Sequence, residues 1–95
     1  MIDKEKLYKE AIRKWGFNAQ VDMMVEECSE LITAIQKLKR VKTIAENDKC
    51  LQKIMEETAD VEIMCEQFKI IFNPDKILEY KFYKLRRLKK RLDES

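Results

Sequence analysis

Two short acidic stretches, Glu26-Glu27-Cys28-Ser29-Glu30 and Glu56-Glu57-Thr58-Ala59-Asp60, lie inside long segments with helical periodicity. Each stretch offers two carboxylates three residues apart, Glu27 with Glu30 and Glu57 with Asp60. This spacing places both side chains on one face of a helix, one turn apart. Two such helices packed together would gather four carboxylates around one point. Such a cluster repels itself unless a cation lies in it, and hard oxygen ligands select magnesium or manganese.

A metal site has two alternatives, an exposed acidic surface and a set of ion pairs with a basic helix near the C-terminus. One carboxylate pair at this spacing is weak evidence, because a Glu-rich helical protein contains such pairs by chance. Two matched pairs that border apolar stripes are stronger evidence. Glu57 falls inside the apolar stripe of its segment, among Ile54, Val61 and Met64. A bare carboxylate there costs several kcal/mol unless it is paired or binds a metal.

Apolar residues spaced three and four apart predict helices over about residues 4–14, 19–40, 44–72 and 74–92. The sequence Thr43-Ile44-Ala45-Glu46 is typical of a capping box, and a start at Asn47 is the alternative for the third helix. Gly16, the only glycine, is expected to end the first helix. The expected N-caps are Asp3, Asn18, Thr43 and Asn73.

Length and composition predict one all-α domain over residues 1–95, built from a few long helices. One Gly and one Pro leave little turn chemistry, which favours a few long helices. A chain of this length buries only roughly 60–65% of its unfolded surface, so we expect a partner subunit. The 20 basic and 18 acidic residues nearly cancel, and overall charge therefore predicts no nucleic-acid partner. Acidic residues gather near 26–30 and 56–66 and basic ones near 37–42 and 81–91, which suits a metal-bound phosphate ligand.

The cysteines and the absence of histidine restrict the chemistry further. Cys28, Cys50 and Cys65 form no CxxC pair and fall on apolar stripes, so we expect buried thiols in a reducing cytoplasm. Without histidine the chain has no Cys-His or Ser-His nucleophile, and a zinc site is disfavoured. No signal peptide and no long apolar run indicates secretion or a membrane span.

The two acidic stretches resemble the motifs of the MazG-type all-α nucleoside triphosphate pyrophosphohydrolases. Val-Glu-Glu-Cys-Ser-Glu-Leu at 25–31 resembles the family's EExxEL, and Glu-Glu-Thr-Ala-Asp-Val at 56–61 resembles its EExxDV. The resemblance covers about residues 15–92 and includes the segment from Trp15 to Gln20 and the later Lys81-Phe82 with its basic residues. Each half of the motif is short, but the ordered pair in an all-helical chain is distinctive.

The resemblance implies a MazG-type fold that is like a four-helix bundle. It also implies a homodimer or homotetramer that hydrolyses a nucleoside triphosphate to a monophosphate and pyrophosphate. It implies Mg²⁺, with Mn²⁺ as the alternative, held by Glu27, Glu30, Glu57 and Asp60. The candidates that orient or deprotonate the attacking water are Glu26 and Glu27, although any of these carboxylates fits that role. Lys81 carries over as a phosphate contact. Lys84, Arg86 and Arg87 follow it in a segment that aligns in more than one way, and Lys84 and Arg87 are also assigned to phosphate.

Two other functions stay open at this level. The chain is alternatively a non-catalytic helical module that engages a protein or nucleic acid through its basic fourth helix, or a protein that sequesters magnesium and nucleotide without hydrolysis. Trp15 and Phe17 either pack the end of the first helix, which we prefer, or stack on a base. Asn18 and Gln20 either face a nucleotide or, as we prefer, serve as a helix cap and a surface amide.

Overall fold

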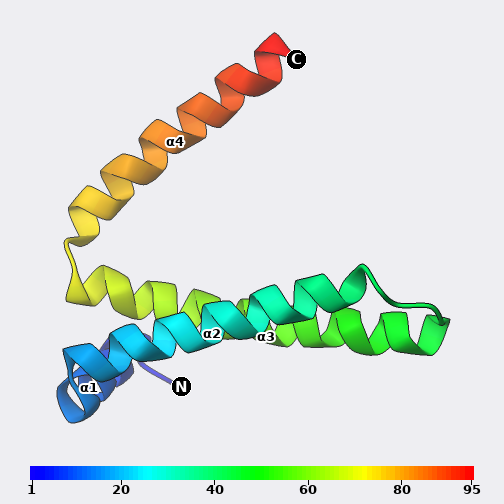
Figure 1. The fold of residues 1–95 in the computed structure, drawn as a ribbon. Helices are drawn as coiled ribbons and strands as arrows, with labels where there is room; N and C mark the ends of the chain where they lie inside the picture. The colour runs from blue at the N-terminus through cyan, green and yellow to red at the C-terminus, as the bar shows by residue number, and fades with distance from the viewer.

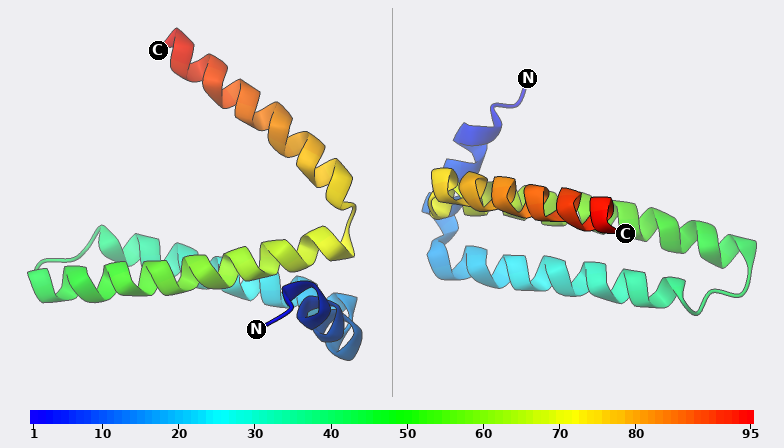
Figure 2. Two further views of the ribbon diagram at one scale, coloured as in Figure 1. Left: turned by 180° about the vertical axis from the view of Figure 1, so that it is seen from behind. Right: turned by 90° about the horizontal axis from the view of Figure 1, so that it is seen from above.

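The computed structural model describes residues 1–95 and contains four α-helices and no strand. They are α1 (Lys4–Trp15), α2 (Phe17–Leu38), α3 (Ile44–Ile71) and α4 (Pro74–Glu94). Helices α2 and α3 form a long antiparallel hairpin, α1 packs at one end of it, and α4 projects away from it (Figures 1 and 2). The predicted all-α class is confirmed, but α4 does not close a four-helix bundle within this chain.

Three of the four predicted N-caps are confirmed, because their side chains accept hydrogen bonds from orphan backbone N–H groups. Asp3 accepts from the N–H of Lys6 at 3.2 Å, and Asn73 accepts from that of Lys76 at 3.1 Å. Thr43 accepts from the N–H of Glu46 at 3.1 Å, which excludes the alternative start of α3 at Asn47. The helix bounds therefore differ from the expected ones by at most two residues.

The predicted cap at Asn18 is wrong, because α2 already begins at Phe17. Gly16 serves two helices at once. Its N–H donates to the carbonyl of Ile12 at 2.8 Å, which ends α1, and its own carbonyl accepts from the N–H of Gln20 at 3.2 Å, which starts α2. A φ of 88° allows this reversal, and residues with a β-carbon rarely adopt that angle.

The interface between α2 and α3 supplies most of the buried residues. Ala34 is 3% exposed and receives a hydrogen bond at its carbonyl from the Cys50 thiol at 3.3 Å. Met64 is 4% exposed, and the amide of Gln67 donates to its sulfur at 3.6 Å. Near the α1 end, the buried Gln20 amide donates to the side-chain carbonyl of Gln67. A small residue and a satisfied polar pair thus let the two helices approach closely.

The prediction of three buried thiols is wrong for Cys65, which is exposed, whereas Cys28 and Cys50 are half-buried. Cys65 faces a cavity of about 650 Å³ between the hairpin and α4. It stays accessible because α4 diverges from the helix that carries Cys65.

Helix α1 is anchored to α3 by one buried side chain. The Tyr8 hydroxyl donates to a carboxylate oxygen of Glu66 at 2.6 Å, and the ammonium group of Lys4 lies 3.5 Å from the same oxygen. Tyr8 is 8% exposed, so its ring fills the space between the two helices.

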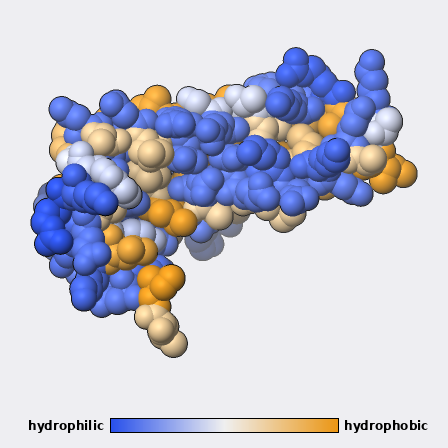
Figure 3. All heavy atoms as spheres, turned by 90° about the horizontal axis from the view of Figure 1, so that it is seen from below, coloured by the Kyte–Doolittle hydropathy of each residue, from blue (hydrophilic) through white to orange (hydrophobic).

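The hairpin has two unlike faces. Seen from the side away from α4, it is covered mainly by hydrophilic side chains (Figure 3). The opposite side, beneath α4, exposes the apolar lining of the cavity, including Met24 and Phe68.

We expect Met64→Ala to lower the free energy of unfolding by about 2–5 kcal/mol, because it leaves a cavity at the α2–α3 interface. Met55→Ala on the same helix is the control, since Met55 is 66% exposed and surface substitutions usually change stability by less than about 0.5 kcal/mol. Urea unfolding followed by circular dichroism measures both. Equal losses would place Met64 outside the core.

We expect the stabilising effect of Tyr8 to depend on pH. The hydrogen bond from Tyr8, with the nearby charge of Lys4, lowers the pKa of Glu66 below its usual value. A carboxyl group with a lowered folded-state pKa stabilises the fold above its unfolded pKa of about 4.3, and this contribution disappears as pH falls through the folded-state pKa. Tyr8→Phe should therefore lower the melting temperature at pH 7 but much less near pH 3. A deficit of equal size at both values would contradict this assignment.

Candidate metal centre

Three carboxylates meet at the middle of the α2–α3 interface. Glu27 comes from α2, and Glu57 and Asp60 come from successive turns of α3. One oxygen of each lies within 4.8 Å of an oxygen of the other two. Glu57 is 3% exposed, Glu27 is half-buried and Asp60 is exposed, so the cluster reaches from the interface to the surface. The structure therefore brings together three of the four predicted metal ligands.

Two buried oxygens in this cluster have no hydrogen-bond partner, Oε2 of Glu27 and Oε2 of Glu57. The other oxygen of Glu57 accepts from the ammonium group of Lys53 at 2.9 Å. A carboxylate oxygen that is buried without a partner loses hydration and gains nothing in return. A cation bound by both orphan oxygens would restore that interaction. The chemistry of the donors, all of them hard oxygens, fits Mg²⁺ or Mn²⁺.

The charges in the cluster perturb each other. Burial raises the pKa of Glu27, and the negative charges of Asp60, Glu30 and Glu57 raise it further. In contrast, the hydrogen bond from Lys53 lowers the pKa of Glu57 against the effect of burial. The cluster thus holds one carboxyl group that takes up a proton readily beside one that stays ionised. A carboxyl group with a raised pKa, such as that of Glu27, gives up its proton when a divalent cation binds in the place of the proton.

Glu30 is exposed and does not belong to the group of three, but it is linked to that group. The pKa of Glu30 is raised because a protonated Glu30 can donate to the Glu57 carboxylate and because the charge of Glu57 opposes ionisation of Glu30. Glu30 also lines a groove of about 350 Å³ on the polar side of the hairpin. The other lining residues are Glu26, Ser29, Thr33, Ala34, Lys37 and Lys53.

Lys37 and Lys53 are functional candidates that the sequence analysis missed. Lys53 lies one helical turn before Glu57, and both lysines line the groove beside Glu30. The sequence does contain a signal for Lys53. It precedes Glu57, a carboxylate within the apolar stripe, by four residues, and this is the spacing of an ion pair on a helix. The groove therefore combines acidic and basic side chains without any contribution from α4.

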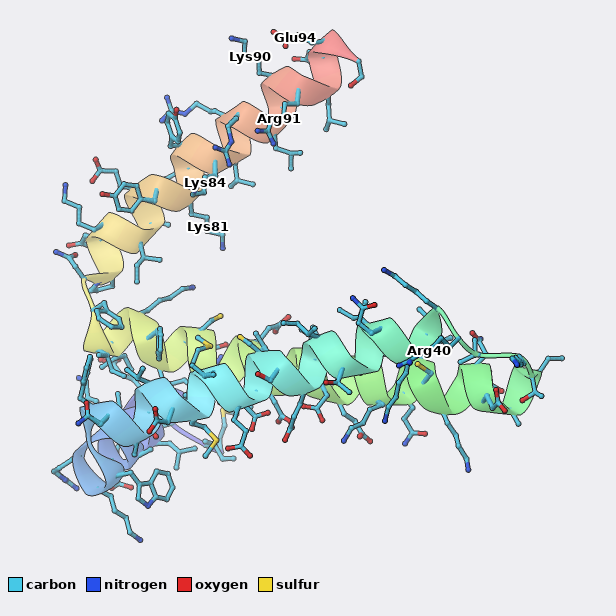
Figure 4. All side chains as sticks on the ribbon, viewed as in Figure 1. Arg40, Lys81, Lys84, Lys90, Arg91 and Glu94 are labelled. Carbon is cyan, nitrogen blue, oxygen red and sulfur yellow. The ribbon has the colours of Figure 1, made fainter.

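The structure does not bring Lys81, Lys84 or Arg87 to the carboxylates. Lys81 and Lys84 line the cavity under α4, and Figure 4 shows Lys81 reaching from α4 toward the hairpin. At about 100° per residue, Met24 of that cavity and Glu30 of the groove lie on opposite sides of Glu27. No ion pair connects α4 with the cluster. Lys81 and Lys84 thus line a different pocket from the groove beside the carboxylates, and Arg87 lines neither.

The remaining predicted contacts are also resolved. The ring centroids of Phe17 and Phe72 lie 5.9 Å apart, edge to face, at the end of α3. Trp15 and Phe17 are 60% and 52% exposed, so the preferred interpretation that both pack the end of the first helix is not met. Gln20 is neither a surface amide nor free to face a nucleotide, because it is 3% exposed and paired with Gln67. Periodicity alone did not identify it, since glutamine is usually a surface residue.

No protein-family model matches this chain, and no curated protein or solved structure matches it either. None of the four helices has the length and apolarity that a membrane span requires. The function of this chain is therefore inferred from its own residues.

We expect magnesium to stabilise the protein through the carboxylate cluster. At a concentration about 100 times its Kd, a ligand of the folded state adds about 2.7 kcal/mol, and each kcal/mol raises the melting temperature of a small domain by roughly 4–8 °C. Glu27→Gln should remove most of this shift, because it deletes one of the orphan oxygens as an anionic ligand. Glu62→Gln, which changes an exposed carboxylate on α3, should preserve it. A shift of the same size in all three proteins would exclude this metal centre.

Proposed function

We propose that the protein is a magnesium-dependent nucleoside triphosphate pyrophosphohydrolase that releases a nucleoside monophosphate and pyrophosphate. The observation that carries the proposal is the pair of buried, unpartnered carboxylate oxygens on Glu27 and Glu57, next to a groove lined by Lys37 and Lys53. A site that pairs hard anionic ligands with nearby cations suits a metal-bound phosphate chain. The resemblance of residues 25–31 and 56–61 to the MazG-type motifs supports the same class of substrate and a MazG-type, oligomeric arrangement.

In this proposal Glu27, Glu57 and Asp60 hold the cation, and Glu30 supplies a further oxygen at the edge of the groove. A bound magnesium ion would neutralise phosphate oxygens and lower the pKa of a coordinated water. A bound cation would neutralise Glu57 and so weaken the ion pair that Lys53 makes with it. The ammonium group of Lys53, with that of Lys37, is available to bind phosphate oxygens and to stabilise charge on the leaving pyrophosphate.

Proton transfer in the groove falls to a carboxylate that does not need to hold the cation. Glu26 is exposed and lines the groove, so it can accept a hydrogen bond from an attacking water and orient it. Glu27 is a weaker choice in this proposal, because its buried, unpartnered Oε2 belongs to the cluster and would be needed there as a ligand. Water is the nucleophile in this proposal, since no activated serine or cysteine lines the groove.

The test is pyrophosphate release from a panel of canonical and modified nucleoside triphosphates, with magnesium and with EDTA. We expect release that depends on magnesium and falls about 100-fold or more in Glu57→Gln, because several kcal/mol of charge stabilisation are lost. Glu62→Gln should keep normal turnover, and circular dichroism should show that both variants stay helical. No release by folded wild-type protein, or an active Glu57→Gln variant, would overturn the proposal.

The second candidate is a binding module that uses α4. The projection of α4 exposes all eight of its basic residues, which favours an anionic partner. Binding to DNA or RNA that weakens steeply with salt, without magnesium-dependent hydrolysis, would support this function over the enzymatic one.

A further inference from the structure

The chain exposes more surface than a compact monomer of its size. Its accessible surface is 8078 Å², whereas a folded monomer of 11.5 kDa is expected to expose about 5,800 Å². The excess is about 2,300 Å² per chain, or about 4,600 Å² for two chains, which lies in the range of obligate homodimer interfaces. Only six of the 95 residues are buried. The excess accessible surface is therefore about as large as the surface that contact with a second copy would bury.

Part of the excess lies on α4. Leu78, Leu85, Leu88 and Leu92 are each at least 50% exposed, and with Lys81 they repeat at intervals of three and four residues over positions 78–92. This is the spacing of the contact positions of a coiled coil. Helices in proteins gain most of their stability from the packing of such a stripe. The stripe on α4 therefore requires a partner.

A matching stripe lies on α2. Val25, Ile32 and Ile35 are 61%, 58% and 42% exposed, and with Val21 and Cys28 they show the same spacing over positions 21–35. The two stripes are equally long, 15 residues each. They do not pair within this chain, because α4 diverges from the hairpin and its far end lies well away from α2 in Figure 1 and in the left view of Figure 2.

We propose that α2 of a second copy packs antiparallel along α4, in the cavity between α4 and the hairpin, and that the exchange is reciprocal across a two-fold axis. The cavity is about 650 Å³ and has an apolar lining that includes Leu85, Leu88 and Phe68. An isologous arrangement of this kind uses each stripe once and closes the assembly at two chains.

Charge favours this occupant. Helix α4 carries eight basic and four acidic residues, whereas α2 carries one basic and four acidic residues. Pairing α4 with a second α4 would bring like charges together, while pairing it with α2 of the partner brings opposite charges together. In the antiparallel register that aligns both stripes, Lys89 of α4 falls opposite Asp22. This surface is separate from the carboxylate cluster, so the proposal stands whether or not the protein hydrolyses nucleotides.

The first experiment measures the mass of the protein in solution by sedimentation equilibrium. We expect a dimer for the wild type, and a weakening of association by at least 100-fold in both Ile32→Lys and Leu85→Glu, because each places a charge in an apolar contact. Gln36→Lys and Tyr83→Glu change exposed residues outside the stripes and should remain dimeric. A monomeric wild type, or a dimer that both stripe variants leave intact, would overturn the proposal.

Mixing the two stripe variants distinguishes reciprocal exchange from other pairings. A heterodimer of Ile32→Lys with Leu85→Glu has one unaltered α2–α4 contact and one contact that carries both substitutions, with the lysine one helical turn from Cys28, the residue that position 85 faces. The mixture should therefore dimerise much more tightly than either variant alone. If α2 instead pairs with α2, or α4 folds back onto its own hairpin, mixing restores nothing and the proposal fails.

A disulfide trap tests the register and does not depend on a variant that dissociates. In the aligned register Leu85 faces Cys28 of the partner subunit. Leu85→Cys in a Cys65→Ser background should oxidise to a covalent dimer joined through positions 85 and 28, as peptide mapping would identify. Tyr83→Cys in the same background should not. The serine removes the thiol that lines the same cavity as Leu85. A monomer after oxidation, or a dimer joined through other positions, would contradict the proposed register.

Discussion

The structure depends on how α2 and α3 pack with carboxylates inside their interface. Glu57 is almost fully buried, and its burial is tolerated because Lys53 neutralises one of its oxygens while Ala34 and Met64 maintain apolar contact on either side along the helices. The second oxygen is left without a partner, as is one oxygen of Glu27. Two such groups in one interface oppose folding. They are consistent with a protein that completes the interface with a cation, because binding then converts a local cost into stability.

The sequence predicted those features that depend on neighbours along one helix. Caps at Thr43 and Asn73 and the place of Glu57 in an apolar stripe follow from spacing alone. It did not predict features that depend on how one helix is rotated against another. Gln20 was read as a surface amide because nothing local indicates that Gln67, 47 residues later, would pair with it. Lys53 differs, because its ion-pair spacing to Glu57 is visible in the sequence and only its place in the groove depends on how the helices pack.

The position of α4 could not be predicted from its own residues. Its cap and its leucine spacing define a helix, but the short connection through Asn73 and Pro74 turns it away from α3, so it makes little contact with its own hairpin. The expected bundle therefore stays open in one chain. The same divergence explains why Cys65 is exposed and why Lys81 lies far from the carboxylates that it was expected to assist.

Helix α2 belongs both to the carboxylate cluster and to the proposed dimer contact, because it carries Glu27 and the stripe from Val21 to Ile35. One side of this helix faces the carboxylate cluster and the other faces the cavity under α4. In the proposed dimer, α4 of the partner subunit holds α2 from the apolar side. That contact limits how far α2 can move from α3 when the carboxylates repel each other. Association and cation binding then act on the same separation, the distance between Glu27 and Glu57, and each should favour the other through linkage.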